Sequence, residues 1–143
     1  MMKKILMLFM LGIGTFTFAQ DQEISFAQLP EKGKNFIQTY FKSEKVKYVM
    51  LDDDYLSKDY EVVLANGVKI EFDGKGNWKE IDGKRNKIPT AFFPEKITAY
   101  VKKSFPHTNI IKIEKNKYSY EVELSNGLDI DFDARGNFKK IDD

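Results

Sequence analysis

A passage of 23 residues occurs twice in this 143-residue chain, and this repeat constrains the fold more than any other feature. Segment 60–82 reads YEVVLANGVKIEFDGKGNWKEID, and segment 120–142 reads YEVELSNGLDIDFDARGNFKKID. Fourteen residues recur unchanged 60 positions later: Tyr60, Glu61, Val62, Leu64, Asn66, Gly67, Ile70, Phe72, Asp73, Gly76, Asn77, Lys79, Ile81 and Asp82. Similarity at a fixed spacing is the signature of a repeated structural unit. The sequence therefore predicts two copies of one unit.

Each copy has the pattern of a three-stranded antiparallel meander. Apolar residues at 60, 62 and 64, and again at 68, 70 and 72, alternate with more polar ones, which is typical of strands with one buried face. Asn66-Gly67 predicts a two-residue type I′ hairpin, in which both central residues need positive φ. Gly76 is expected in the left-handed conformation beside a bulge. A third strand is expected from Trp78 to Ile81, and from Phe138 to Ile141 in the second copy.

A helix and a further strand are expected before each meander. Apolar residues recur at helical spacing after Pro30 and after Pro94, and Phe105-Pro106 predicts the end of the second helix. The additional strands are expected at 46–51 and 110–113. The expected fold is thus α+β: two tandem α-ββββ repeats form one antiparallel curved sheet with both helices packed on one face. The repeats would occupy residues 20–83 and 84–143.

The N-terminus has the three-part pattern of a secretory signal peptide. Lys3 and Lys4 precede an apolar run at 5–18, and Thr17-Phe18-Ala19 provides small residues for cleavage after Ala19. The alternative is a retained N-terminal anchor. Cleavage would release segment 20–143 to the periplasm or the exterior, without stable insertion in the membrane. The chain has no cysteine, so no disulfide bond stabilises the exported domain.

Composition argues against several classes of function. The formal net charge is +1, which gives no general attraction to nucleic acid. His107 is the single histidine, and its position beside Pro106 indicates a loop residue rather than part of a catalytic triad. Carboxylates on strand faces are solvated by default. No catalytic residue and no cofactor are predicted, so a hydrolase is the least favoured class.

The order of these motifs resembles that of a known family. The helix with Phe36-Ile37, the YEV strands, the Asn-Gly turns, the IEFD and IDFD strand ends and the Gly-Asn-aromatic turn exits resemble those of PepSY-like exported proteins of Bacteroidetes. These proteins are also described as beta-lactamase-inhibitor-protein-like, and the resemblance covers about 24–143. It implies a tandem repeat with helices on one face of a curved sheet. It also implies a link to peptidase binding, because related PepSY domains bind or restrain peptidases, and the inhibitor namesake grips an enzyme with its concave sheet face. No catalytic residue is implied.

Metal binding has two weak candidates in the sequence. Asp52, Asp53 and Asp54 form an acidic run of hard oxygen ligands that suit Ca²⁺, although adjacent aspartates in a loop commonly stay hydrated. The loop at 73–77 departs from the calcium-loop pattern, because Lys75 stands where a ligand belongs and Trp78 where the invariant glycine belongs. No metal site is therefore assigned.

The sheet face opposite the helices is the leading candidate for binding a partner. In the second copy it carries four carboxylates, and in the first copy it is mixed. Strand parity places the two aromatic residues at 78 and 138 on this face, unless a bulge resets the parity and buries both rings. The candidate contact residues are Trp78, Phe138, Glu121, Glu123, Asp129, Asp131, Glu61, Lys69 and Glu71.

These observations favour an exported, non-enzymatic binding module. Its expected partner is an envelope or secreted protein such as a peptidase. Two alternatives remain open: a small-ligand or Ca²⁺-binding envelope protein, and a structural envelope protein without a discrete partner.

Overall fold

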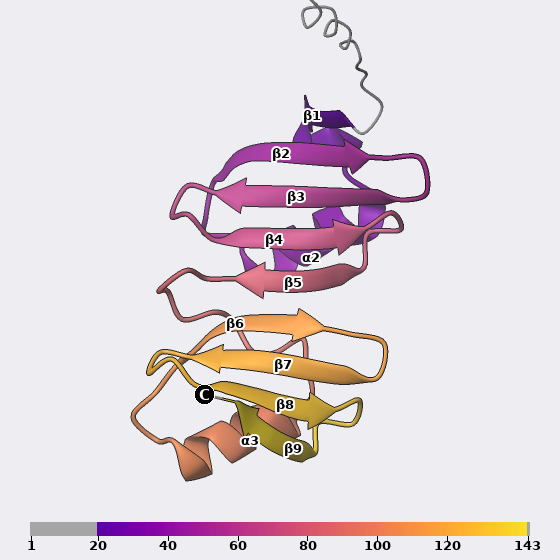
Figure 1. Ribbon diagram of the computed structural model, residues 1–143. Helices are drawn as coiled ribbons and strands as arrows, with labels where there is room; N and C mark the ends of the chain where they lie inside the picture. The colour runs from indigo at the N-terminus through magenta and orange to yellow at the C-terminus, as the bar shows by residue number, and fades with distance from the viewer. Residues whose placement is uncertain (1–19, 143) are drawn as a thin grey trace, which may run out of the picture.

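The computed structural model describes residues 20–142, which form one open antiparallel sheet of nine strands (Figure 1). The strands lie side by side in chain order, from β1 at one edge to β9 at the other. They are β1 (Gln20–Ile24), β2 (Val46–Asp53), β3 (Lys58–Leu64), β4 (Lys69–Asp73), β5 (Trp78–Asp82), β6 (Ile110–Lys115), β7 (Ser119–Leu124), β8 (Asp129–Asp133) and β9 (Phe138–Asp142). The expected signal peptide, residues 1–19, lies outside the described residues.

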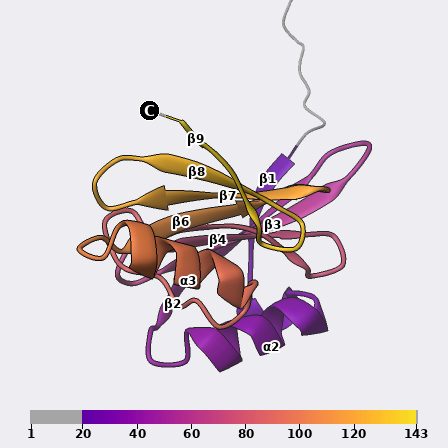
Figure 2. The ribbon, with the colours of Figure 1, turned by 90° about the horizontal axis from the view of Figure 1, so that it is seen from below.

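Two α-helices lie on the same side of this sheet (Figure 2). Helix α2 (Glu31–Tyr40) follows Pro30, and helix α3 (Glu95–Ser104) follows Pro94; a short 3₁₀ helix, η2 (Phe26–Gln28), precedes α2. The first N–H groups of a helix have no hydrogen-bond partner within the helix. Proline suits this position because it has no N–H. Among residues 20–142, no helix has the length and apolar character needed to cross a membrane.

The core lies between the helices and the sheet. Val62, Ile70 and Phe72 from the first half are buried, and so are the residues at 122, 130 and 132 in the second half. The ring of Phe36 on α2 meets Phe72 edge-on with centroids 5.6 Å apart, and Tyr100 on α3 meets Phe132 at the same distance. Each fully buried side chain of this size stabilises the fold by about 1.5–3 kcal/mol. The strand alternation expected from the sequence is therefore correct.

The two halves join through β5 and β6. Glu80, Ile81 and Asp82 pair with residues 114, 113 and 112, so the sheet continues from one half to the other. Segment 83–94 links β5 to α3, and the backbone N–H of Gly83 donates to the carbonyl of Ile111 at 2.7 Å. The sheet has one strand more than the eight expected. Strand β1 was missed, because it lies directly after the apolar N-terminal run and has little apolar alternation of its own.

The Asn-Gly hairpins differ from the expected type I′ turns. Gly67 has φ of 93°, but Asn66 does not have positive φ. The N–H of Gly67 donates to the carbonyl of Leu64, and the N–H of Leu64 donates to the carbonyl of Val68, both at 2.9 Å. This is a three-residue loop with a left-handed glycine at its end. The Asn66 side chain favours it by accepting the N–H of Val68 at 3.1 Å.

The turns after β4 and β8 match expectation, with left-handed glycines at Gly76 (φ 89°) and Gly136 (φ 92°). In the first turn, the Asp73 carboxylate accepts the N–H groups of Lys75 and Asn77 at 2.9 and 3.0 Å. Desolvation acts to raise the pKa of Asp73, but the hydrogen bonds from Asn77, Lys75 and Gly76 together outweigh it and lower that pKa. A Cβ atom on Gly76 would lie 2.9 Å from the backbone nitrogen of Gly33. The turn therefore packs directly against α2.

Candidate functional site: the open face of the sheet

The open face is the side of the sheet opposite α2 and α3. Within residues 20–142, no helix covers it (Figure 2). Because successive side chains of a strand point to opposite faces, the residues that alternate with the buried ones lie here. Val62 points into the core, so the preceding residue of β3, Glu61, points to the open face. In the same way, Glu121 precedes the core residue Val122 on β7 and points to the open face.

A row of carboxylates crosses this face from one edge to the other. The register pairs residue 23 with 50, 50 with 61, 61 with 71, 71 with 80, 80 with 114, 114 with 121, 121 with 131 and 131 with 140. Seven of these nine positions are acidic, and we call these seven the acidic row: Glu23, Glu61, Glu71, Glu80, Glu114, Glu121 and Asp131. Directly opposed side chains lie about 4.5–5.5 Å apart at Cβ, so like charges oppose folding here.

Lysines on the same face balance only part of this charge. Lys69 pairs with Glu61 at 3.3 Å, Lys112 with Glu80 at 3.5 Å and Lys140 with Asp131 at 3.9 Å. Within the described part of the chain, the other members of the row, which are Glu23, Glu71, Glu114 and Glu121, form no salt bridge. The open face therefore has an excess of negative charge, although the whole chain has a net charge of only +1.

This excess changes the acidity of individual groups. Desolvation, followed by the charge of Glu80, raises the pKa of Glu71. Desolvation, followed by the charges of Asp131 and Asp129, raises the pKa of Glu121. Raised pKa values mean that the surroundings disfavour the ionised carboxylate, and a bound positive charge would relieve that cost.

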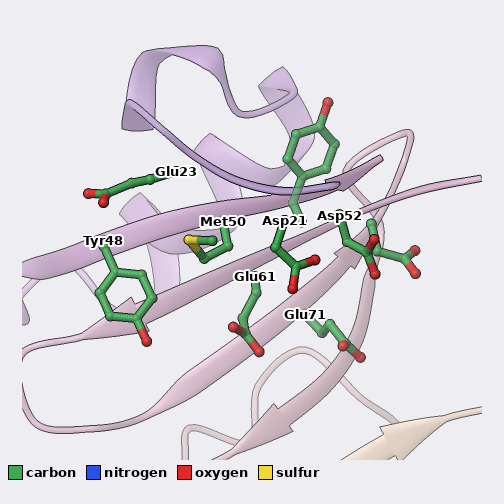
Figure 3. Close-up of a pocket in the computed structure, with 9 residues that line it drawn as sticks. Asp21, Glu23, Tyr48, Met50, Asp52, Glu61 and Glu71 are labelled. Carbon is green, nitrogen blue, oxygen red and sulfur yellow. The ribbon is translucent and has the colours of Figure 1, made fainter. Parts of the chain in front are cut away.

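A hollow of about 470 Å³ lies on the open face over β1, β2, β3 and β4 (Figure 3). We call it the β1–β4 hollow. It is lined by Tyr48, Met50 and Tyr60 together with six acidic residues. These are Asp21, Glu23, Asp52, Asp59, Glu61 and Glu71. In Figure 3, Asp21, Glu61 and Glu71 extend to the same side of the strands. Their charge surrounds a partly apolar surface.

The second half has a smaller hollow of about 90 Å³ on the same face. It is lined by Lys112, Glu114, Glu121, Glu123 and Asp129. The expected acidic ladder of the second copy is thus brought together, because Glu121 pairs with Asp131 and Glu123 with Asp129 across β7 and β8. Glu61, Lys69 and Glu71 also lie on the open face. Their contact with a partner remains a prediction.

Trp78 is not on the open face, so its predicted orientation is wrong. A register irregularity in the β4–β5 pair places Trp78 opposite the core residue Phe72, with Lys79 as the extra residue. The bulge resets the strand parity, which is the alternative that the sequence left open. The indole is 8 % exposed and meets Phe92 edge-on at 5.1 Å. It belongs to the core.

Phe138 occupies the equivalent position on β9, opposite Phe132. Its ring stacks on Tyr100 of α3 with centroids 4.7 Å apart, and it is therefore also on the helix side of the sheet. It is nevertheless 44 % exposed, because β9 is the edge strand and, among residues 20–142, no further strand lies beside it. Neither aromatic residue contributes to the open face.

The aspartates at 52–54 do not converge on one point. Asp52 lies on the open face opposite residues 21 and 59, whereas the adjacent Asp53 points to the other side. Asp54 caps its own loop, since its Oδ1 accepts the N–H groups of Leu56 and Ser57 at 2.8 and 3.1 Å. Among residues 20–142, the carboxylates that do converge are those of Glu121, Asp131 and Asp142, with ligand atoms within 4.8 Å of one another. His107 is exposed in the turn after α3.

The sequence prediction missed Glu23, Glu80 and Glu114 as members of the row. Glu80 and Glu114 alternate with the buried residues Ile81 and Ile113, so the sequence pattern could have placed them on the open face. Their cross-strand pairing could not be predicted, because it depends on which strand of one half pairs with which strand of the other. Glu23 was missed together with β1.

Family comparison identifies related sequences. A family model described as "Putative beta-lactamase-inhibitor-like, PepSY-like" matches residues 58–140. A search of curated proteins found no significant match.

Solved structures from two Bacteroides species resemble this chain closely. A "putative calcium-regulated periplasmic protein" of Bacteroides thetaiotaomicron is 41% identical, with a TM-score of 0.83 over 86% of this chain and 97% of its own. A "putative periplasmic protein from DUF2874 family" of Bacteroides vulgatus is 40% identical, with a TM-score of 0.81 over 87% and 98%. A "putative periplasmic protein of unknown function" of the same species is 36% identical, with a TM-score of 0.81 over 87% and 100%.

Proposed function

The chain belongs to the PepSY-like, beta-lactamase-inhibitor-like family, and from this membership we propose that it is an exported, non-enzymatic binding module. Its open face holds a protein partner, such as a peptidase of the cell envelope. The observation that carries this proposal is the uncovered side of a nine-stranded sheet, on which paired carboxylates oppose one another without full compensation. A fold keeps such destabilising pairs where they serve binding.

The proposed location is the periplasm. It is supported by the signal-peptide pattern of residues 1–19 and by the three similar structures, which are described as periplasmic proteins. The alternative is secretion into the medium. Fractionation of a culture, with detection of the protein in the periplasmic extract and in the medium, would distinguish the two.

The two halves are proposed to be tandem copies of one α-ββββ unit, 20–83 and 84–143. The 14 recurring residues support this proposal, as do the equal order of helix and strands in each half and the matching turns at Gly76 and Gly136. On this proposal, the uncovered side of each copy contributes half of one continuous binding surface.

Site-directed photocrosslinking in the cell envelope tests the binding proposal. A benzophenone side chain replaces Val63, which lies on the open face opposite Lys69, and in a matched control it replaces Ala99, which is exposed on α3. We expect a discrete adduct from position 63 that purified wild-type protein displaces, and none from position 99. Equal adducts at both positions, or no saturable adduct at 63, would refute binding through this face. The absence of a saturable adduct at position 63 is what a structural envelope protein without a discrete partner would give.

Ca²⁺ binding is the second candidate function. The convergence of Glu121, Asp131 and Asp142 favours it, and one similar protein is described as calcium-regulated. Carboxylate oxygens are the ligands that Ca²⁺ prefers. Titration calorimetry with CaCl₂ tests this candidate: heat that disappears in Asp131→Asn supports it, and no heat at millimolar Ca²⁺ removes it.

A further inference from the structure

We propose that the occupant of the open face is a basic segment of polypeptide, which places a lysine or arginine side chain in the β1–β4 hollow. This inference rests on the proposed binding function and adds the chemistry of the partner. It commits to a cationic polypeptide rather than to an inorganic ion or a neutral surface.

The first argument is the separation of charge over the molecule. Lys69, Lys112 and Lys140 lie on the open face, whereas four other lysines lie on the helices at the opposite side of the sheet: Lys32 and Lys34 of α2, and Lys102 and Lys103 of α3. The acidic row therefore faces outward as a local negative field within a nearly neutral chain. Such a field attracts oppositely charged partners and repels acidic ones.

The second argument is the chemistry of the β1–β4 hollow. Asp59 is paired with Lys79 at 3.2 Å and Glu61 with Lys69 at 3.3 Å. The hollow's remaining carboxylates, those of Asp21, Glu23, Asp52 and Glu71, form no salt bridge within residues 20–142. These groups have acceptor oxygens available for an ammonium or guanidinium group.

Tyr48 and Met50 make the hollow suitable for a long cationic side chain rather than for a bare ion. Both line the hollow; Met50 lies between Glu23 and Glu61 on the neighbouring strands, and Tyr48 lies opposite Val63. The methylene groups of lysine or arginine pack on apolar and aromatic surface while the charged end reaches the surrounding oxygens. A small divalent cation would gain nothing from these two side chains.

The length of the acidic row indicates a polypeptide segment. Strands are spaced by about 4.8 Å, so the row spans roughly 34 Å from Glu23 on β1 to Asp131 on β8. An extended peptide rises about 3.3 Å per residue, and about 10 residues would cover that distance. Several basic side chains of one segment would then meet both the β1–β4 hollow and the smaller hollow beside Glu114 and Glu121.

Fluorescence anisotropy with defined peptides tests the inference. The probe is a fluorescein-labelled 12-residue peptide of alternating arginine and serine, and the comparison peptide has glutamate in place of arginine. The face variant is Glu61→Gln with Glu71→Gln. The matched control is Glu31→Gln with Glu95→Gln, which removes equal charge from exposed positions on α2 and α3. Thermal melts verify that all variants remain folded.

We expect the arginine peptide to bind and the glutamate peptide not to bind. Losing two half-exposed charge pairs corresponds to about 1 kcal/mol, so the face variant should bind about fivefold more weakly, and the control within twofold of wild type. Equal weakening of both variants, or equal binding of both peptides, would overturn the inference. Tyr48→Ala with Met50→Ala leaves the charge unchanged and should also weaken binding severalfold; unchanged binding would remove the hollow from the proposal.

Failure of this inference is distinct from failure of the proposed function. A partner that crosslinks at position 63 and binds the Glu61→Gln, Glu71→Gln variant as tightly as wild type would retain the function and overturn the cationic chemistry. Absence of any saturable adduct at position 63 would overturn the function, whatever the peptides show.

Discussion

The indole ring of Trp78 stacks on the ring of Tyr120, with centroids 6.2 Å apart and planes inclined by 29°. Trp78 belongs to the last strand of the first half and Tyr120 to the second strand of the second half. The side-chain ammonium of Lys115 lies 4.8 Å from the centre of the indole ring. Phe92, from the segment that connects the halves, closes the cluster. These contacts, with the β5–β6 hydrogen bonds, hold the two halves together.

Trp78→Ala is expected to destabilise the protein severely. Removing a buried aromatic side chain of this size costs about 3–5 kcal/mol. Phe138→Ala should cost only about 1–2 kcal/mol, because that ring is already half exposed. Urea denaturation of the two variants measures the difference, and Trp78→Phe serves as the control that keeps an aromatic ring. Equal losses for the two alanine variants would contradict the burial described above.

Glu71→Gln should stabilise the protein at pH 7. The pKa of Glu71 is raised in the folded state, so folding favours its neutral form: that contribution is fully present below its ordinary pKa of 4.5 and is lost as pH rises through the folded value. The glutamine variant keeps the neutral form at every pH, and we expect a gain of about 0.2–1 kcal/mol at pH 7 that vanishes by pH 4. Urea denaturation at both pH values measures it.

Glu61→Gln is the matched control for that prediction, since Glu61 lies in the same row but pairs with Lys69. Its neutralisation removes an ion pair and should give no gain at pH 7. A gain as large as that of Glu71→Gln would show that these ion pairs do not offset the repulsion along the row.

Asp73→Ala should show the opposite dependence on pH. Hydrogen bonds in the turn lower the pKa of Asp73, so its stabilising contribution is present above its ordinary value of 3.8 and is lost as pH falls through the folded value. We expect a loss of about 1–2 kcal/mol at pH 7 that shrinks towards pH 2.5. A loss that does not change with pH would argue against an ionised carboxylate as the acceptor.

Gly76→Ala should be more harmful than Gly67→Ala. Both glycines are left-handed, and placing alanine in that conformation costs about 1–2 kcal/mol. A Cβ atom at position 76 would also meet the backbone of Gly33 at 2.9 Å, whereas no atom of the described part of the chain lies within 4 Å of one at position 67. We expect at least about 1 kcal/mol of additional loss for Gly76→Ala from that clash. Thermal denaturation monitored by circular dichroism compares the two variants, and equal melting temperatures would contradict the packing of this turn on α2.

Much of the fold could be predicted because it depends on local chemistry. The alternation around Val62 and Ile70 assigns strands and their buried side, and the prolines at 30 and 94 mark where the helices begin. The candidate site was predicted in part: Glu61 and Glu71 were placed correctly, but the row through Glu80 and Glu114 required the pairing of β5 with β6. That pairing is a long-range contact, and no local pattern encodes it.

Equivalent positions of the repeat show what only the tertiary structure decided. Ile81 and Ile141 are identical in the sequence, yet Ile81 is fully buried and Ile141 is 40 % exposed. At the neighbouring pair of positions, Trp78 is likewise buried whereas Phe138 is partly exposed. The sequence by itself determined which residues alternate, where the chain turns and which side of each strand is apolar. Burial was decided by neighbours: β5 lies inside the sheet with β6 and the second half beside it, whereas β9 is an edge strand that, within residues 20–142, has a partner on one side only.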